Sequence, residues 1–214
     1  MNKIDRILKA AKAEAIPEGM SGLWFIVKAQ TDKVLQEVDG KTTFLPPGLY
    51  THLYRMTEAT MDKCPPGVVV MEDTPFELRT HLQFMLRAYG HILVTGLGLG
   101  CVVRGLLANE TVVHVTVVEK SPDVLKLVAP YMPKERLEII EADALKWTKK
   151  NTRPFDFAWH DLWTNRETGE PHLDLWHTKL IFNCADKVKH QGAWRYHRIA
   201  KRWLQRRGRI KLIA

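Results

Sequence analysis

The chain has 214 residues, of which 45% are hydrophobic, and it carries a formal net charge of +8. This composition is typical of a folded protein with a substantial core, and it excludes a disordered or fibrous chain. The longest apolar stretch, residues 92–108, is interrupted by Arg104 and rich in glycine, so we expect no membrane span. The first fifteen residues have the pattern of an amphipathic helix and not of a secretory signal, which predicts a cytoplasmic location.

Cysteine, histidine and charge patterns add three expectations. Cys64, Cys101 and Cys184 lie far apart, and the histidines show no metal-ligand spacing, so we expect neither a disulfide framework nor a metal site.

After Asp186 the chain carries lysines and arginines but no acidic residue. Aromatic residues interleave with these charges, a mixture that suits nucleic-acid contact, although aromatic residues at helical spacing also dock helices on sheets.

Residues 1–72 predict a small β-rich extension. A helix at the N-terminus is followed by segments that alternate apolar and polar residues, and Asp39-Gly40 is a hairpin signal. We expect short antiparallel strands over Leu23–Ala29, Lys33–Val38, Thr42–Leu45 and Val68–Met71.

A second unit is expected over residues 73–214. It opens with a helix that runs to about Tyr89, with Thr74 as N-cap, Pro75 in the first turn and Glu77 at the third position of a capping box. From His91 onward, strands and helices alternate, which predicts an α/β fold with a Rossmann-like, doubly wound parallel sheet. The expected strands are His91–Thr95, Val112–Glu119, Leu137–Glu141 and Phe155–His160, and the helices end near Ala108, Pro130 and Lys150.

The first of these strands ends in three alternate glycines, Gly96, Gly98 and Gly100. Glycine allows a positive φ and the close approach of a ligand to the backbone, and a helix N-terminus follows, so the turn predicts a nucleotide-type pocket. A dinucleotide would require a further glycine where the chain has Cys101, which disfavours NAD.

Each later strand also ends in a polar group. Glu119 could accept hydrogen bonds from ribose hydroxyls, and Asp143 could accept one from an exocyclic amine such as that of adenine. The fourth strand ends in His160 and Asp161, between Trp159, which we expect in the core, and Trp163, which could line the pocket.

These residues resemble the class I S-adenosylmethionine-dependent methyltransferase superfamily. The resemblance rests on the glycine turn, Glu119, the Ala142-Asp143-Ala144 element and Asp161. Residues 117–124 and 155–163 are most similar to motifs of the spermidine-synthase-like branch. Small uncharacterised phage and bacterial proteins of this branch carry segments similar to residues 71–77 and 191–194.

The resemblance implies S-adenosylmethionine as cofactor. The glycines would pass close to its methionine part, Glu119 would hold the ribose, and Asp143 the adenine amine. The chain departs from the family at Thr95, where many members have an acidic residue. It also has too few residues after the fourth strand for the usual three further strands, so the sheet is expected to be C-terminally truncated. The implied cofactor contacts are Thr95, Gly96, Leu97, Gly98, Gly100, Glu119, Lys120, Ala142, Asp143, Ala144 and Asp161.

The leading hypothesis is a methyltransferase with an unidentified acceptor. Asp161 or His160 would accept the proton of the acceptor, and Glu77 and Trp163 would contact it. A structural role is the alternative for His160, and a capping role the alternative for Glu77.

Two other functions stay open. The branch resemblance also suggests aminopropyl transfer to a polyamine, which wants several carboxylates, and the nearby candidates are Asp73, Glu77, Asp156 and Asp161. A nonenzymatic module with a degenerate cofactor site, binding nucleic acid or protein through the basic C-terminal segment, is the second alternative.

Overall fold

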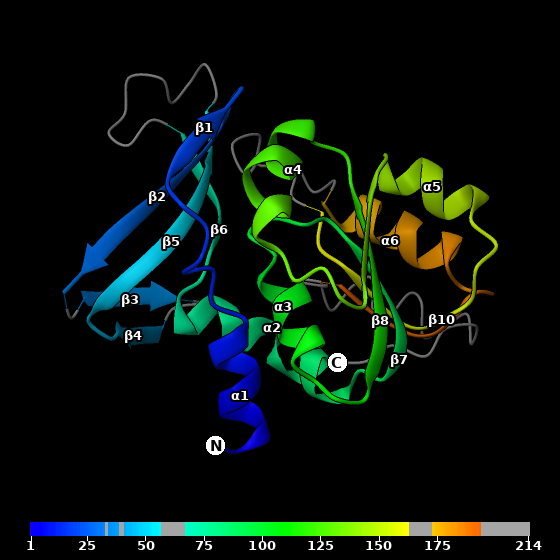
Figure 1. The fold of residues 1–214 in the computed structure, drawn as a ribbon, viewed down its shortest axis with the longest axis horizontal. Coiled ribbons are helices and arrows are strands. Elements are labelled where there is room, and N and C mark those ends of the chain that lie inside the picture. The colour runs from blue at the N-terminus through cyan, green and yellow to red at the C-terminus, as the bar shows by residue number, and fades with distance from the viewer. Residues whose placement is uncertain (33, 39–40, 57–66, 163–172, 194–214) are drawn as a thin grey trace.

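A computed structural model describes residues 1–32, 34–38, 41–56, 67–162 and 173–193. A parallel sheet with helices on both faces forms the larger part, and an antiparallel sheet from the N-terminal region stands beside it (Figure 1). Within these ranges no helix is both long and apolar enough to cross a membrane.

The parallel sheet has five strands in the order β11-β10-β7-β8-β9. Chain order therefore runs outward from the centre in both directions, as in a doubly wound fold, and this confirms the predicted α/β class. All four pairings are parallel, so the carboxyl ends of the strands share one edge. The strands are β7 (Gly90–Thr95), β8 (Val112–Glu119), β9 (Leu137–Glu141), β10 (Phe155–His160) and β11 (Val188–Ala193).

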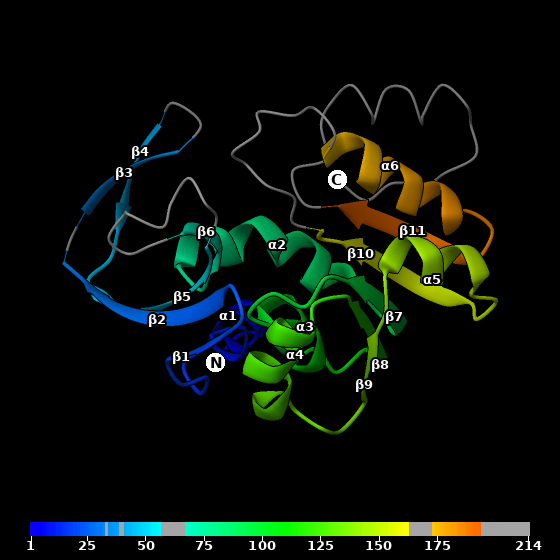
Figure 2. The same cartoon turned by 90° about the horizontal axis from the view of Figure 1, so that it is seen from above.

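Helices cover the two faces of this sheet in separate groups (Figure 2). One face packs against α2 (Pro75–Arg87), α3 (Cys101–Leu107) and α4 (Pro122–Val128), which the 3₁₀ turn η2 (Ala129–Tyr131) follows. The other face packs against α5 (Ala144–Lys150) and α6 (Leu173–Asn183).

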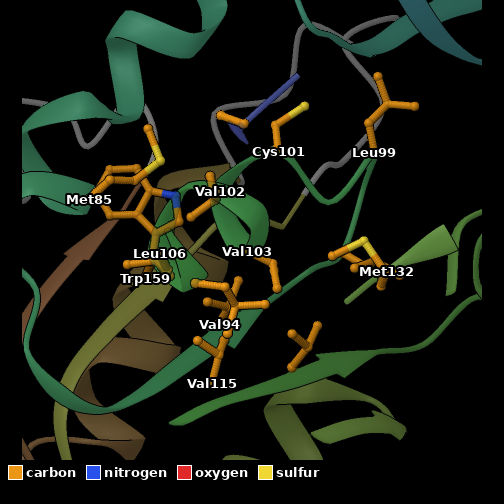
Figure 3. Packing of buried hydrophobic residues seen from close by; sticks show 14 of the residues in the cluster. Met85, Val94, Leu99, Cys101, Val102, Val103, Leu106, Val115, Met132 and Trp159 are labelled. Atoms are coloured by element: carbon orange, nitrogen blue, oxygen red, sulfur yellow. The ribbon is translucent and has the colours of Figure 1, made fainter. Parts of the chain in front are cut away.

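Two apolar cores result from the alternation of side chains along the buried strands. On β7, Ile92 and Val94 join the larger core, whereas Leu93 joins the core beneath α5 and α6. In the larger core Val94 and Val115 of the sheet lie beneath the side chains of α3 (Figure 3). Close packing on both faces fixes the positions of the strand ends.

The N-terminal region forms a four-stranded antiparallel sheet in the order β1-β2-β5-β6. Its strands are β1 (Gly19–Ser21), β2 (Trp24–Thr31), β5 (Gly48–Arg55) and β6 (Val68–Glu72), preceded by α1 (Lys3–Ala10). The pair β3 (Val34–Val38) and β4 (Lys41–Leu45) forms a separate antiparallel ribbon. The predicted strands are thus confirmed, the first helix is shorter than expected, and β1 and β5 are additional.

A buried carboxylate, that of Asp73, joins the N-terminal sheet to the rest of the molecule. It accepts hydrogen bonds from the backbone N–H groups of Ala13, at 2.9 Å, and Thr51, at 2.8 Å. Asp73 is fully buried and immediately precedes the N-cap of α2. The antiparallel sheet is therefore fixed next to α2 and the glycine turn.

Candidate functional site

The glycine turn between β7 and α3 requires glycine at each of its three alternate positions. Gly96, Gly98 and Gly100 have φ values of 94°, 51° and 74°. A Cβ on Gly96 would overlap the carbonyl oxygen of Asp161, and one on Gly98 would lie 2.5 Å from the Met71 sulfur. The turn is therefore packed against the end of β10 on one side and β6 on the other.

Glu119, the last residue of β8, is bound to this turn through its carboxylate. Oε2 accepts a hydrogen bond from the backbone N–H of Leu97 at 2.8 Å, and Oε1 accepts one from Ser121 at 2.8 Å. Each oxygen keeps a second lone pair for another donor. The side chain is only 9% exposed, so its direction is fixed.

A cavity of about 320 Å³ lies at the carboxyl edge of the parallel sheet, within the size range of small-molecule sites. It brings together residues that the sequence placed at separate strand ends. The expected site residues that line it are Gly96, Gly98, Glu119, Lys120, Asp143, Ala144, Asp161 and Glu77.

Asp143 also caps a helix. Its Oδ1 accepts a hydrogen bond from the backbone N–H of Lys146 at 3.0 Å, which fixes the start of α5. Asp143 and Ala144 line the cavity, whereas Ala142 packs beneath α5 in the second core.

His160 and Thr95 form a buried polar chain beneath the cavity instead of lining it. His160 Nδ1 lies 3.1 Å from Thr95 Oγ1, and Nε2 lies 3.1 Å from Oε1 of Gln191 on β11. Both side chains are fully buried, and burial lowers the pKa of His160 to about 4. Of the two roles left open for His160, these contacts favour the structural one. Leu97 and Gly100 are buried in the turn and do not line the cavity either.

Asp161, directly after β10, lines the cavity and has a raised pKa. Removal from water raises its pKa to about 6, an effect that His81 opposes and Glu77 reinforces. Its backbone N–H donates to the carbonyl oxygen of Thr95 at 2.9 Å. The main chain of Asp161 therefore lies beside the glycine turn.

Glu77 lies in the first turn of α2, where the hydroxyl of Thr74 accepts the hydrogen bond of the Glu77 backbone N–H. Thr74 is thus the N-cap, as predicted. Glu77 nevertheless lines the cavity, and its Oε1 lies 3.5 Å from Nε2 of the buried His81.

The N-terminal sheet contributes a wall of the cavity that the sequence did not predict. Trp24 and Arg55 are paired across β2 and β5, and the Arg55 guanidinium lies 5.6 Å from the centre of the Trp24 ring. Met71 of β6 approaches the glycine turn, and its sulfur lies 3.1 Å from the backbone nitrogen of Leu99. Leu53 and Val70 of the same sheet also line the cavity, and two further unpredicted lining residues, Leu162 after β10 and Trp176 on α6, come from the larger part of the molecule.

Two carboxylates expected near a polyamine acceptor lie elsewhere, which corrects that expectation. Asp73 is buried and engaged by two backbone N–H groups. Asp156 accepts hydrogen bonds from Lys189 and from the backbone N–H of His91, near the amino ends of the strands and away from the cavity. Bonding to Lys189 lowers the pKa of Asp156. Of the four candidates, only Glu77 and Asp161 line the cavity.

Three expectations concern residues outside the described ranges: the substrate contact of Trp163, the basic segment after residue 193, and Cys64. Cys101 and Cys184 are buried, and burial raises the pKa of the Cys184 thiol to about 12. The described part of the chain contains no group of three or more potential metal-binding side chains.

The solved structures described below are distant likenesses of this chain. No protein-family model matches the chain, and no curated protein matches it. Among solved structures, spermidine synthase from Thermotoga maritima is 17% identical over 83% of this chain and 55% of its own, with a TM-score of 0.49. A spermidine synthase in complex with the transition-state analogue AdoDATO is 17% identical over 81% of this chain and 54% of its own, with a TM-score of 0.49.

A human protein, methyltransferase-like protein 13 in complex with SAH, is 18% identical over 52% of this chain and 58% of its own, with a TM-score of 0.41. The chain thus spans little more than half the length of these proteins. Likenesses this distant concern the fold and carry no argument about activity.

Proposed function

We propose that this chain binds S-adenosylmethionine in the cavity at the carboxyl edge of its parallel sheet and acts as a methyltransferase. The observation that carries the proposal is that residues from separate strand ends meet at one cavity. The glycine turn, Glu119, Asp143 and Asp161 lie at the ends of four different strands, yet all line one cavity.

The residues present fit this cofactor. Glu119 is held by two backbone amides and keeps lone pairs for ribose hydroxyls. One oxygen of Asp143 caps α5, which leaves the other for an adenine amine. Gly96 and Gly98 line the cavity with backbone atoms alone, which would let the methionine part approach the main chain.

When bound, S-adenosylmethionine supplies an electrophilic methyl group, and the acceptor–methyl bond forms as the sulfur–methyl bond breaks. The contribution of the protein is then to position the acceptor and to receive its proton. Asp161 suits the second task, since a pKa of about 6 leaves it mostly ionised at neutral pH but more basic than an ordinary aspartate.

Isothermal titration calorimetry tests the proposal directly. We expect the wild-type chain to bind S-adenosylmethionine and its demethylated product, S-adenosylhomocysteine. Decarboxylated S-adenosylmethionine, the donor in aminopropyl transfer, should bind less tightly. Tighter binding of the decarboxylated form would favour the aminopropyl alternative, and no binding of any of the three would overturn the cofactor assignment and favour the nonenzymatic one.

A further inference from the structure

The peptide group between Asp161 and Leu162 is held on both sides. Its carbonyl oxygen packs against Gly96, where an added Cβ would overlap it. Its N–H, which belongs to Leu162, donates a hydrogen bond of 3.3 Å to Nε2 of His177 on α6. The carbonyl and the N–H of a trans peptide point in opposite directions, so this group is fixed between the glycine turn and α6.

The peptide group before Asp161 is held as well. The Asp161 N–H donates a hydrogen bond of 2.9 Å to the carbonyl oxygen of Thr95, the last residue of β7. When the peptide planes on both sides of a residue are fixed, its φ and ψ are fixed, and with them the direction of its Cα–Cβ bond. The hydrogen bond to His177 therefore restricts the directions open to the side chain of Asp161, which lines the cavity.

His177 is well suited to accept this hydrogen bond. Its side chain is only 3% exposed, and burial lowers the pKa of its ring to about 4. The ring is therefore neutral at neutral pH. Nε2 accepts a hydrogen bond only when the ring proton is on Nδ1, so the contact with Leu162 also defines the tautomer.

A second buried chain of hydrogen bonds links α6 to Thr95, the other anchor of Asp161. The carbonyl oxygen of Ile181 on α6 accepts a hydrogen bond from Nε2 of Gln191 at 3.2 Å. Gln191 Oε1 lies 3.1 Å from His160 Nε2, and His160 Nδ1 lies 3.1 Å from Thr95 Oγ1. Because Oε1 can only accept, His160 Nε2 donates and its Nδ1 accepts from the Thr95 hydroxyl. Both segments that hold Asp161 are thus connected to the same helix.

We propose that His177 is a positioning residue that holds the carboxyl group of Asp161 beside the sulfonium of the cofactor and the acceptor. This inference rests on the proposed methyl transfer, in which the acceptor's hydrogen passes as a proton to Asp161 while the acceptor–methyl bond forms and the sulfur–methyl bond breaks. A carboxylate in this position also attracts the positive sulfonium. The position of Asp161 is therefore measurable through cofactor binding, without knowledge of the acceptor.

Isothermal titration calorimetry at neutral pH compares S-adenosylmethionine with S-adenosylhomocysteine, which lacks the sulfonium charge. The measured quantity is the ratio of the two affinities. His177→Leu removes the hydrogen-bond acceptor at similar size, so we expect it to lower the preference for the charged ligand about fivefold. His177→Gln keeps an acceptor oxygen at similar reach and should stay within about twofold of the wild-type ratio.

The same comparison in an Asp161→Asn background tests whether His177 acts through Asp161. There, His177→Leu should leave the ratio unchanged, because the carboxylate that it positions is gone. Loss in His177→Leu, recovery in His177→Gln and no effect in the Asp161→Asn background together support the inference. A merely structural role would lower stability without changing the preference between two ligands of nearly the same shape. An unchanged ratio in His177→Leu overturns the inference.

Nitrogen-15 NMR of the wild-type imidazole decides the case if His177→Leu fails to fold. An unprotonated Nε2 coupled to the Leu162 amide across the hydrogen bond supports the inference, and a protonated Nε2, which cannot accept, overturns it. The two proposals fail in different ways. The coupled Nε2 in a chain that binds neither ligand contradicts the proposed function alone, whereas normal binding with an unchanged ratio in His177→Leu contradicts only this inference.

Discussion

Replacing Gly98 by Ala tests whether the glycine turn is fixed by its contact with β6. Gly98 has a φ of 51°, and an added Cβ would lie 2.5 Å from the sulfur of Met71. The left-handed backbone costs an alanine roughly 1 kcal/mol, and the steric overlap costs about 1–3 kcal/mol more. For a chain of this size, that total lowers the melting temperature by roughly 5–15 °C.

Calorimetric or circular-dichroism melting of four chains measures this effect: wild type, Gly98→Ala, Met71→Ala and the double variant. Met71→Ala removes the overlap, so Gly98→Ala should cost only the backbone part, about 1 kcal/mol, in that background. Gly19→Ala is the matched control, because its Cβ would make an ordinary contact of 3.6 Å with Leu127. Equal costs of Gly98→Ala in both backgrounds would refute the contact with Met71 as the cause.

Two further predictions concern buried polar groups. Asp73→Asn replaces a carboxylate that accepts two backbone hydrogen bonds with an amide that can accept through only one atom. Urea denaturation should therefore show that the free energy of unfolding falls by about 2–4 kcal/mol. The exposed control Asp186→Asn should change it hardly at all. Because burial holds the pKa values of His160 and His177 at about 4, the unfolded chain binds protons first as the pH falls below about 6.5, and the free energy of unfolding should decrease by about 1.4 kcal/mol per pH unit for each histidine. The raised pKa of Asp161 has the opposite effect on the free energy of unfolding below about pH 6. Replacing His177 by Gln should make the net decrease of this free energy with falling pH shallower. An unchanged slope would contradict the burial of His177 as its cause.

The sequence closely predicted the alternating strands and helices from β7 to β10. There the apolar runs are buried on both faces, and local signals mark the element ends: the three glycines, and caps such as Ser121 and Asp143. Local chemistry and tertiary structure agree in this part of the chain, which is why the predicted bounds lie within a few residues of the observed ones.

The strand β11 could not be predicted in the same way. Its sequence, Val-Lys-His-Gln-Gly-Ala, has little apolar character, and it forms a strand because it pairs with β10 at the edge of the sheet. The buried Gln191 within it is explained by tertiary contacts, because its Oε1 lies 3.1 Å from Nε2 of His160, 31 residues earlier, and its Nε2 donates to the carbonyl oxygen of Ile181.

The candidate site was predictable only on the side formed by the parallel sheet. Residues such as Glu119 and Asp143 lie at strand ends, and the edge of the sheet brings them together. The opposite wall, with Trp24 and Arg55, depends on how the N-terminal sheet packs, and no local pattern encodes that.

The most direct test of the account compares S-adenosylmethionine binding by Glu119→Gln and Glu141→Gln in calorimetry. The two glutamates are direct neighbours across β8 and β9, but Glu119 lines the cavity and Glu141 is exposed at the end of its strand. Loss of a charge-assisted hydrogen bond to the ribose should weaken binding by Glu119→Gln about 10- to 100-fold. We expect Glu141→Gln to bind within twofold of wild type. Equal affinities of the two variants, or no binding by the wild type, would contradict the central claim.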